Sequence, residues 1–325
     1  MHTRQFGRDG LTVPEIGLGC WQLGGGWGKD WDNGVAQTIL EQAYQSGVRF
    51  IDTADVYGDG ASESSIGEFL HKYEDLTVAT KVGRGAIYPD GYSRETVRAA
   101  TERSLQRLGV SRLDLTQLHC VPPAVLRDGK IFDWLREMRD DGLIERFGAS
   151  VETVEEGLVC LEQEGLTSLQ VIFNIFRQKP LEELLPRARD KGVAIIVRLP
   201  LASGLLSGKM TRATVFGADD HRNFNRDGAQ FNVGETFAGI EFGTGVDLAE
   251  QVARFVPPSM TMAQMALRWL LDQDAVSVVI PGASSPAQVA ANASAAALPV
   301  LPAEVHAGLA QLYREQIHAA IRGPY

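Results

Sequence analysis

The sequence predicts an α/β protein folded as a (β/α)8 TIM barrel, with a short N-terminal hairpin and long loops at the C-terminal face, in a single domain over residues 1–325. First, short apolar runs rich in β-branched residues recur eight times along the chain. Second, segments with helical periodicity follow most of these runs, and strands that alternate with helices form a parallel sheet. Third, 325 residues are a normal length for one such barrel. A doubly wound open sheet stays the alternative.

Each expected strand is a run of four to eight residues. The strands begin, in order, at Ile16, Arg49, Thr77, Leu113, Ile144, Ser168, Val193 and Val276. Helical periodicity predicts helices over residues 35–47, 93–109, 130–142, 154–165, 180–192 and 260–274, and again after Pro281. Several of these segments end in Gly, which suits a helix C-terminus. Near residues 205–245 the alternation stops, and a Gly- and Asn-rich stretch too long for a connector predicts a functional lid or a disordered loop.

The charge balance indicates small-molecule partners. The formal net charge is −10 at pH 7, which disfavours nucleic acids and anionic membranes because both bind basic surfaces. The N-terminus lacks the apolar core of a signal peptide, and no run of about 18 apolar residues occurs. We therefore expect a cytoplasmic protein, and the sequence leaves open whether it is a monomer or a homo-oligomer.

Neither the cysteines nor the histidines have the spacing of a metal site. Cys20, Cys120 and Cys160 are odd in number and share no CxxC spacing, so we expect reduced thiols without a disulfide. The six histidines show no HxH or HExxH pattern, and we expect no metal. A GxG begins at Gly17, but without a third glycine at the Rossmann spacing it is a weak signal for a dinucleotide-binding loop.

Polar side chains end three consecutive expected strands. Asp52 ends the second strand with Tyr57 just beyond it, Lys81 ends the third, and His119 ends the fourth. Each alone has an ordinary explanation as a turn or surface residue, but barrel active sites gather where strands end, and this combination suits proton transfer. An ammonium next to Tyr57 favours the phenolate and lowers the pKa of the phenol, and Asp52 supplies the counter-ion. His119 is expected either to hydrogen-bond the substrate carbonyl oxygen or to share the proton. The hydride must come from a cofactor.

These residues carry a resemblance to a known family. "DTADVYG" at 52–58 followed by "SE", "TK" at 80–81 and "QLH" ending at His119 resemble the aldo-keto reductase superfamily. "PLASGLLSGK" from Pro200 and "IPGASSPAQVAAN" from Ile280 are similar to its bacterial and potassium-channel-β-subunit branch. The resemblance implies an NAD(P)-dependent oxidoreductase that interconverts an aldehyde or ketone, with a sugar as one option, and its alcohol. It assigns the catalytic tetrad to Asp52, Tyr57, Lys81 and His119, with Tyr57 as general acid or base. The alternative is a regulatory or sensor protein that binds the cofactor with negligible turnover.

The resemblance also implies a cofactor, NADP(H) or NAD(H), with NADP(H) the commoner in the family. Ser150 and Gln170 are expected at the nicotinamide carboxamide, residues 201–204 along the pyrophosphate, and residues 282–292 at the adenosine end. The full set of expected cofactor contacts is Gly19, Cys20, Trp21, Ser150, Gln170, Arg198, Leu201, Ser203, Gly204, Leu206, Gly282, Ser284, Gln288 and Asn292. The expected substrate contacts are Trp21, Trp27, Tyr57 and His119.

Three departures from the family pattern stand out. Val151 replaces an Asn that is frequent next to Ser150, and Arg198 stands where an aromatic side chain commonly stacks on the nicotinamide; a guanidinium plane can stack as well. No Lys or Arg occurs near Ser284 or Gln288, so we expect weak discrimination for a 2′-phosphate.

Two acidic residues and one tryptophan near the expected active site also have assigned roles. Asp55 and Glu63 are expected to have local roles, with Glu63 capping the helix behind Ser62. Trp31 is expected to join Trp21 and Trp27 in an aromatic rim over the substrate, with core packing as the alternative.

Overall fold

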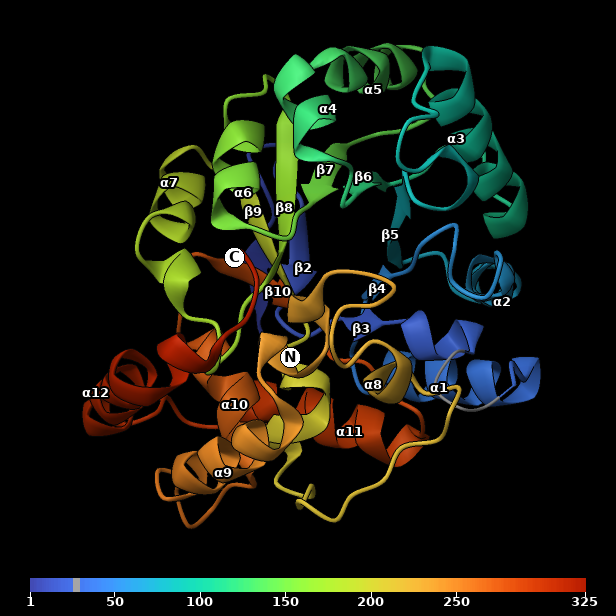
Figure 1. Ribbon diagram of the computed structural model, residues 1–325. Coiled ribbons are helices and arrows are strands. Elements are labelled where there is room, and N and C mark those ends of the chain that lie inside the picture. The colour runs from blue at the N-terminus through green and yellow to red at the C-terminus, as the bar shows by residue number, and fades with distance from the viewer. Residues whose placement is uncertain (26–29) are drawn as a thin grey trace.

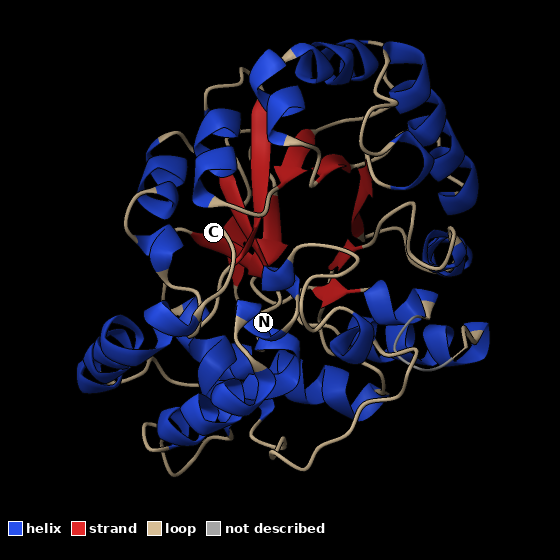
Figure 2. Ribbon diagram, viewed as in Figure 1, coloured by secondary structure: helices blue, strands red, loops and turns tan. Residues whose placement is uncertain are grey.

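The computed structural model describes residues 1–25 and 30–325 and has the predicted barrel architecture. Eight parallel strands follow one another around the sheet in the order of the chain, and helices surround them (Figures 1 and 2). Parallel bridges from Ile16 to Val279 and from Gly19 to Gly282 join the first strand segment to the last. The barrel strands are β3 (Leu18–Gly19), β4 (Phe50–Asp52), β5 (Thr77–Val82), β6 (Leu115–His119), β7 (Phe147–Ser150), β8 (Leu166–Ile172), β9 (Ala194–Arg198) and β10 (Val276–Val279).

Helices follow the strands in the alternation that the periodicity predicts. They are α1 (Asn33–Gln45), α2 (Ala61–Leu70), α3 (Arg94–Leu108), α4 (Pro123–Asp128), α5 (Lys130–Asp140), α6 (Val154–Leu161), α7 (Leu184–Asp190), α8 (His221–Phe224), α9 (Phe242–Ala253), α10 (Met262–Leu271), α11 (Pro286–Ser294) and α12 (Ala303–Leu312). Local sequence fixes several ends: the side chains of Ser93 and Thr96 form a capping box at the start of α3, and Gly109 ends it in the left-handed conformation, with φ 68°.

Side chains alternate between the inside and the outside of the barrel, as the two-residue period of a strand requires. Phe50, Ala79 and Leu115 belong to a small apolar cluster with residues of β9 and β10. Two residues further along the same strands, and therefore on the same face, come a carboxylate, an ammonium and an amide: Asp52, Lys81 and Gln117. The inner face thus changes from apolar to polar towards the C-terminal ends of the strands.

The N-terminal hairpin closes the other end of the barrel. β1 (Thr3–Gln5) pairs with β2 (Thr12–Pro14) in antiparallel register, as predicted. Phe6 and Val13 are buried in the same cluster as Phe50, and the Phe6 and Phe50 ring centroids are 5.4 Å apart. The base of the barrel is therefore filled with apolar side chains, and its polar residues lie at the opposite end.

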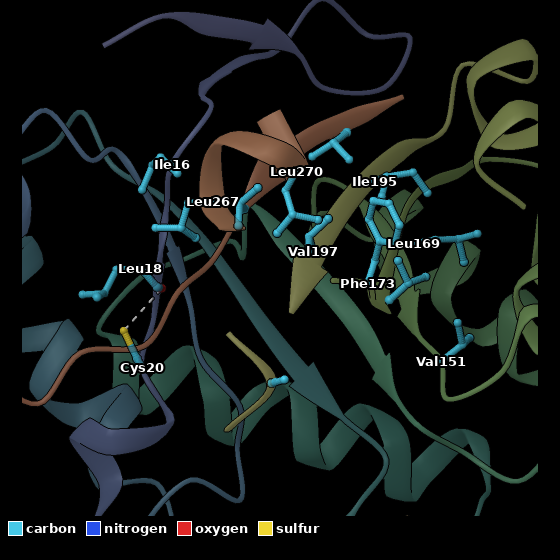
Figure 3. Packing of buried hydrophobic residues seen from close by; sticks show 14 of the residues in the cluster. Ile16, Leu18, Cys20, Val151, Leu169, Phe173, Ile195, Val197, Leu267 and Leu270 are labelled. Atoms are coloured by element: carbon cyan, nitrogen blue, oxygen red, sulfur yellow. Dashed lines mark hydrogen bonds between the residues drawn. The ribbon is translucent and has the colours of Figure 1, made fainter. Parts of the chain in front are cut away.

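A larger apolar core lies between the strands and the helices. Figure 3 shows Leu267 and Leu270 of α10 in one cluster with Ile195 and Val197 of β9. Full burial of a side chain such as Leu267 contributes roughly 1.5–3 kcal/mol, so this layer fixes the strand ends that carry the polar residues.

The predicted loop near 205–245 contains more structure than the sequence indicated. It holds the four-residue helix α8 and two 3-10 turns, and its last residues enter α9, a 12-residue helix that the sequence reading did not predict. Glu241 caps α9 by accepting hydrogen bonds from the backbone N–H groups of Gly243 and Thr244, at 3.0 and 2.8 Å. The segment over 180–192, predicted as one helix, begins as a 3-10 turn and becomes α-helical only at α7. In the described part of the chain, no helix is both long and apolar enough to cross a membrane.

Candidate active site

Lys81 joins two of the other predicted tetrad residues, Asp52 and Tyr57, into one hydrogen-bonded group. Its ammonium donates to Asp52 Oδ1 at 2.5 Å, to the backbone oxygen of Thr53 at 2.7 Å and to Tyr57 Oη at 3.3 Å. The Lys81 side chain is 1 % exposed and that of Asp52 4 %. A buried ammonium needs such partners, because an unpaired charge in the interior costs several kcal/mol. The local fold supplies them, since β4 and β5 are neighbouring strands.

Two amides hold the second oxygen of Asp52. Gln170 Nε2 donates to Asp52 Oδ2 at 2.7 Å and Gln117 Nε2 at 3.2 Å. Gln117 was missed in the sequence reading, although it lies two residues before His119 on the same face of β6, and this spacing could have identified it. Ser150 Oγ donates to Gln170 Oε1 at 3.4 Å, so the two residues expected at the nicotinamide carboxamide are adjacent.

The net pKa shift of Tyr57 is opposite to the one expected. Burial raises the pKa of the phenol, while the Lys81 ammonium lowers it and the Asp52 charge raises it again. The ammonium acts in the predicted direction, but desolvation of the phenolate outweighs it. In this structure Tyr57 is therefore a neutral phenol at pH 7, which is the form that a proton donor requires.

His119 is a neutral imidazole beside the phenol. Burial is the main cause of its pKa lying well below 6.5, and the charges of Arg84 and Lys81 lower it further. The ring centroids of His119 and Tyr57 are 5.8 Å apart. Nδ1 of His119 has no hydrogen-bond partner among the described residues. A neutral ring can donate one hydrogen bond without carrying charge.

Aromatic rings line one side of Tyr57. The Trp21 ring stacks with Tyr57 at 6.3 Å between centroids and also meets His221 at 4.7 Å and Phe231 at 6.1 Å. His221 belongs to α8 and Phe231 to the segment after it, so the long insertion supplies two of the three rings of this wall. Neither residue was identified from the sequence.

Trp27 and Trp31 were expected to join Trp21 in an aromatic rim. Trp27, an expected substrate contact, lies outside the described residues. Trp31 is exposed, and its indole N–H donates to Ser65 of α2 at 3.3 Å. Its place in an aromatic rim stays a prediction, because part of the segment between Trp21 and Trp31 lies outside the described residues.

Four charged side chains, which we call the rim charge cluster, pair with one another next to Cys120, the residue that follows His119: Arg84, Glu152, Arg198 and Glu235. Arg84 Nη2 is 2.8 Å from Glu152 Oε1 and 3.2 Å from Glu235 Oε1, and Arg198 Nη1 is 3.4 Å from Glu235 Oε1. Only Arg198 was anticipated.

Cys120 borders the rim charge cluster, and Arg198 Nη2 donates to its Sγ at 3.5 Å. Ligand atoms of Cys120, Glu152 and Glu235 lie within 4.8 Å of one another, a spacing that a metal ion could use. Two guanidinium groups already bind these carboxylates, and they would repel a cation. Cys20, Cys120 and Cys160 are all buried free thiols, as expected. Burial raises the pKa of each thiol, which makes them poor nucleophiles.

The segment after β9 has an unusual backbone. Leu199, Ala202, Ser203 and Gly204 all have positive φ, from 48° to 100°. Only Gly tolerates this conformation without cost, and strained residues of this kind cluster where a functional site fixes them. Leu201 and Leu206 belong to the same segment, which is the one expected along the pyrophosphate.

The expected adenosine end lies at the start of α11. Ser285 caps this nine-residue helix, and Gln288 Oε1 accepts hydrogen bonds from the backbone N–H and the hydroxyl of Ser284, at 2.8 and 3.1 Å. Asn292 Nδ2 donates to the Gly282 oxygen at 3.3 Å. Gly19 forms a parallel bridge with Gly282. The N–H of the adjoining Cys20 donates to the backbone oxygen of Asp52 at 2.8 Å. The expected cofactor residues that the structure describes thus follow a path around the barrel mouth.

Glu63 does not cap α2, contrary to the sequence reading. Gly60 occupies the N-cap position, and no side chain caps this end. Glu63 is fully buried in the first turn, where it pairs with Arg107 Nη2 at 2.6 Å and accepts a hydrogen bond from Thr80 Oγ1. Because Thr80 precedes Lys81 on β5, this pair fixes the strand end that carries the ammonium. Burial, followed by the charge of Glu63, raises the pKa of Asp55 to about 7.

We expect the free energy of unfolding to fall between pH 7 and pH 5, in part because of His221. Burial is the main cause that lowers its pKa to about 4. In the unfolded chain the ring has a pKa near 6.5 and takes up a proton at pH 5 that the folded protein does not bind, so stability rises with pH. The contribution is about 2 kcal/mol over this range. Urea unfolding of the wild type and His221→Gln at both pH values checks this; an equal loss of stability in both proteins would contradict it.

Comparisons with known proteins give a consistent picture. The sequence profile described as "Aldo/keto reductase family" matches residues 15–314. The chain is 30% identical over 313 residues to the NADH-specific methylglyoxal reductase of Escherichia coli K12, covering 89% of this chain and 92% of that protein. Among solved structures, it resembles the holo form of an aldo-keto reductase from Bacillus halodurans, with TM-score 0.77 and 27% identity over 100% and 98% of the two chains. A glycerol dehydrogenase from Gluconobacter oxydans gives TM-score 0.73 and 28% identity over 99% and 97%.

Proposed function

This chain belongs to the aldo/keto reductase family, and from that premise we propose that it is an NAD(P)-dependent oxidoreductase that interconverts an aldehyde or ketone and its alcohol, with Tyr57 as the general acid or base. The single observation that carries the proposal is the contact of 3.3 Å between Lys81 Nζ and Tyr57 Oη, next to a neutral His119. Family membership alone supports an oxidoreductase that acts on carbonyl or alcohol groups; the tetrad geometry supports the assignment of roles.

The chain's own residues account for the proton transfer. In the reduction direction, the Tyr57 hydroxyl gives its proton to the carbonyl oxygen, which becomes the alcohol oxygen. The Lys81 ammonium stabilises the phenolate left behind, and Asp52 holds the ammonium in place. His119 donates a hydrogen bond to the same carbonyl oxygen. A bound nicotinamide cofactor would supply the hydride in this direction and accept it in the other.

Features of the barrel mouth fit such a cofactor. The four positive-φ residues from Leu199 to Gly204 form a backbone segment suited to close approach by a pyrophosphate. The N-terminus of α11 favours an anion, because the positive end of its helix dipole lies there. Ser150 and Gln170 are buried next to each other where the strands end, and the Ser150 and Gln170 groups are of the kind that bind an amide.

The proposal is tested with the purified chain, both reduced cofactors and a panel of aldehydes, ketones and sugars, with alcohols run against the oxidised cofactors. The panel includes methylglyoxal and glycerol, because relatives carry these substrates in their names. Consumption of the cofactor that depends on one substrate class supports the enzyme and identifies the class. Tight binding of a cofactor without consumption by any panel member would favour the regulatory or sensor function instead.

We expect little discrimination between the two cofactors. Residues 282–292 contain no Lys or Arg. The exposed side chain of Ser284 donates a hydrogen bond to Gln288 Oε1 at 3.1 Å. A missing charge-assisted contact to a 2′-phosphate is worth about one to two decades in affinity. NAD(H) should therefore act within about tenfold of NADP(H), and Ser284→Arg should shift the preference towards NADP(H) by about one decade. The ratio of kcat/KM for the two cofactors, measured at one salt concentration, checks both statements.

The control for this experiment is Ser294→Arg, at the exposed C-terminal end of the same helix, α11. It adds the same charge away from the expected 2′-phosphate and should leave the ratio unchanged. A wild-type preference for NADP(H) above about a hundredfold would contradict the prediction, since it exceeds the effect of one missing contact.

A further inference from the structure

The rim charge cluster combines four separate parts of the chain and is formally neutral. Arg84 follows β5, Glu152 follows β7, Arg198 ends β9, and Glu235 comes from the long insertion after β9. Two guanidinium groups face two carboxylates, and Glu235 Oε1 lies within 3.4 Å of both arginines. Removal of any one member therefore leaves a net charge at the barrel mouth, where solvent screens it only partly.

The insertion fixes Glu235 firmly. Ser203 Oγ donates to the Glu235 backbone oxygen at 3.1 Å and accepts from the Phe237 N–H at 3.1 Å. Asn232 Nδ2 binds the other carboxylate of the cluster, Glu152, at 3.0 Å. Burial opposes the charge of Glu235, but Arg198 and Arg84 outweigh it and the pKa of its carboxyl is lowered. Glu235 is therefore an ionised, nine-tenths buried carboxylate next to Arg198.

Arg198 occupies the inner face of β9, two residues beyond the buried Ile196. Its guanidinium lies close to the tetrad, because Nη2 donates at 3.5 Å to Sγ of Cys120, the residue that follows His119. If the nicotinamide ring binds next to the tetrad, the Arg198 guanidinium is a cation near it, in addition to the Lys81 ammonium that Asp52 already neutralises. The oxidised ring carries one positive charge and the reduced ring carries none, whereas the rest of the cofactor is the same in both states.

We propose, resting on the proposed function, that the balance between Arg198 and Glu235 sets the relative affinity of the enzyme for oxidised and reduced nicotinamide cofactor. Arg198 alone disfavours the positive oxidised ring, and Glu235 cancels this repulsion. The pair acts through charge and position and has no part in the proton transfer, so Glu235 is a positioning residue. Arg198 can therefore stand at the position where relatives commonly have an aromatic side chain, and the enzyme still does not bind the reduced cofactor much more tightly than the oxidised one.

Two substitutions have effects of opposite sign. Glu235→Gln leaves the cluster with a net charge of +1, which weakens binding of the oxidised cofactor more than that of the reduced form. Arg198→Gln leaves it at −1 and strengthens binding of the oxidised form relative to the reduced one. One unit charge at short range changes a binding constant by about three- to tenfold after partial screening by solvent. A purely structural disturbance changes both affinities in the same direction and leaves their ratio constant.

The experiment measures the dissociation constants of both cofactor forms by fluorescence titration, at pH 8 and one low salt concentration. The ratio of the oxidised to the reduced constant is compared for the wild type, Glu235→Gln and Arg198→Gln. Glu155→Gln is the matched control, because it removes the same charge from an exposed pair with Arg127 on the outside of the barrel.

We expect the ratio to rise at least about threefold in Glu235→Gln, to fall at least about threefold in Arg198→Gln, and to stay constant in the control. A ratio within about twofold of the wild type in either folded variant, or shifts of the same sign in both, overturns the proposal. If one variant does not fold, the direction in which the ratio of dissociation constants changes in the other variant decides. Failure of the wild type to bind either form contradicts the proposed function itself and is thereby distinguished from failure of this inference.

Discussion

Replacement of Tyr57 by Phe is expected to lower kcat by about 10²–10⁴-fold while the dissociation constant of the cofactor changes little. The substitution removes only the hydroxyl group, which accepts a hydrogen bond from Lys81 at 3.3 Å. The ring and its stacking on Trp21 remain, so the shape of the site is kept. Without the hydroxyl, the group proposed to protonate the carbonyl oxygen is lost. Steady-state turnover with the best substrate of the panel, together with cofactor titration, measures both quantities.

Tyr73→Phe serves as the control for this experiment. The Tyr73 hydroxyl donates to Glu41 at 2.8 Å on the outside of the barrel, so its loss should leave kcat unchanged. A kcat of Tyr57→Phe within a few-fold of the wild type would remove Tyr57 from the mechanism and, with it, the assigned role of Lys81.

Arg107→Ala is expected to destabilise the fold by about 3 kcal/mol. The carboxylate of Glu63 is completely buried and pairs with Arg107 at 2.6 Å. Breaking a buried pair costs about 3–5 kcal/mol because a charge is left without a partner, and the 24% exposure of the Arg107 side chain places the effect at the low end. The midpoint of urea unfolding should therefore shift to clearly lower denaturant concentration.

An exposed ion pair provides the comparison. Arg127 and Glu155 lie 2.6 Å apart with side chains 56% and 74% exposed, and pairs of this kind contribute about 0–1 kcal/mol. Arg127→Ala should hardly move the unfolding midpoint. Equal shifts in the two variants would show that Glu63 does not depend on its buried partner.

The strands and tetrad positions were predictable because their signals are local. An apolar run that ends in a polar residue, such as Phe50 to Asp52, specifies both a strand and the barrel end at which it finishes. The parallel sheet and its strand order follow from the alternation of elements, and the structure agrees with them.

The rest depended on contacts between residues distant in sequence. Arg84 and Glu235 are 151 positions apart, and Gln170 is 118 positions from Asp52, so no periodicity indicates either pair. The pKa of Tyr57 was misjudged for a related reason: a sequence shows a neighbouring charge more readily than the degree of burial, and burial decided the sign. Helix α9 was missed because the Gly-rich residues before it read as a continuation of the loop.

Phe6 and Val13 pack against Phe50 and close the base of the barrel with apolar side chains. In the proposed function, substrate and cofactor enter at the opposite, polar end of the barrel, past the loops that lie there. Substitutions at the base can therefore change thermal stability without changing access of substrate and cofactor. Substitutions in the loops can change that access without weakening the packing of the base. Substitutions that change substrate range and substitutions that raise stability lie at opposite ends of the molecule, so their effects should be additive when they are combined.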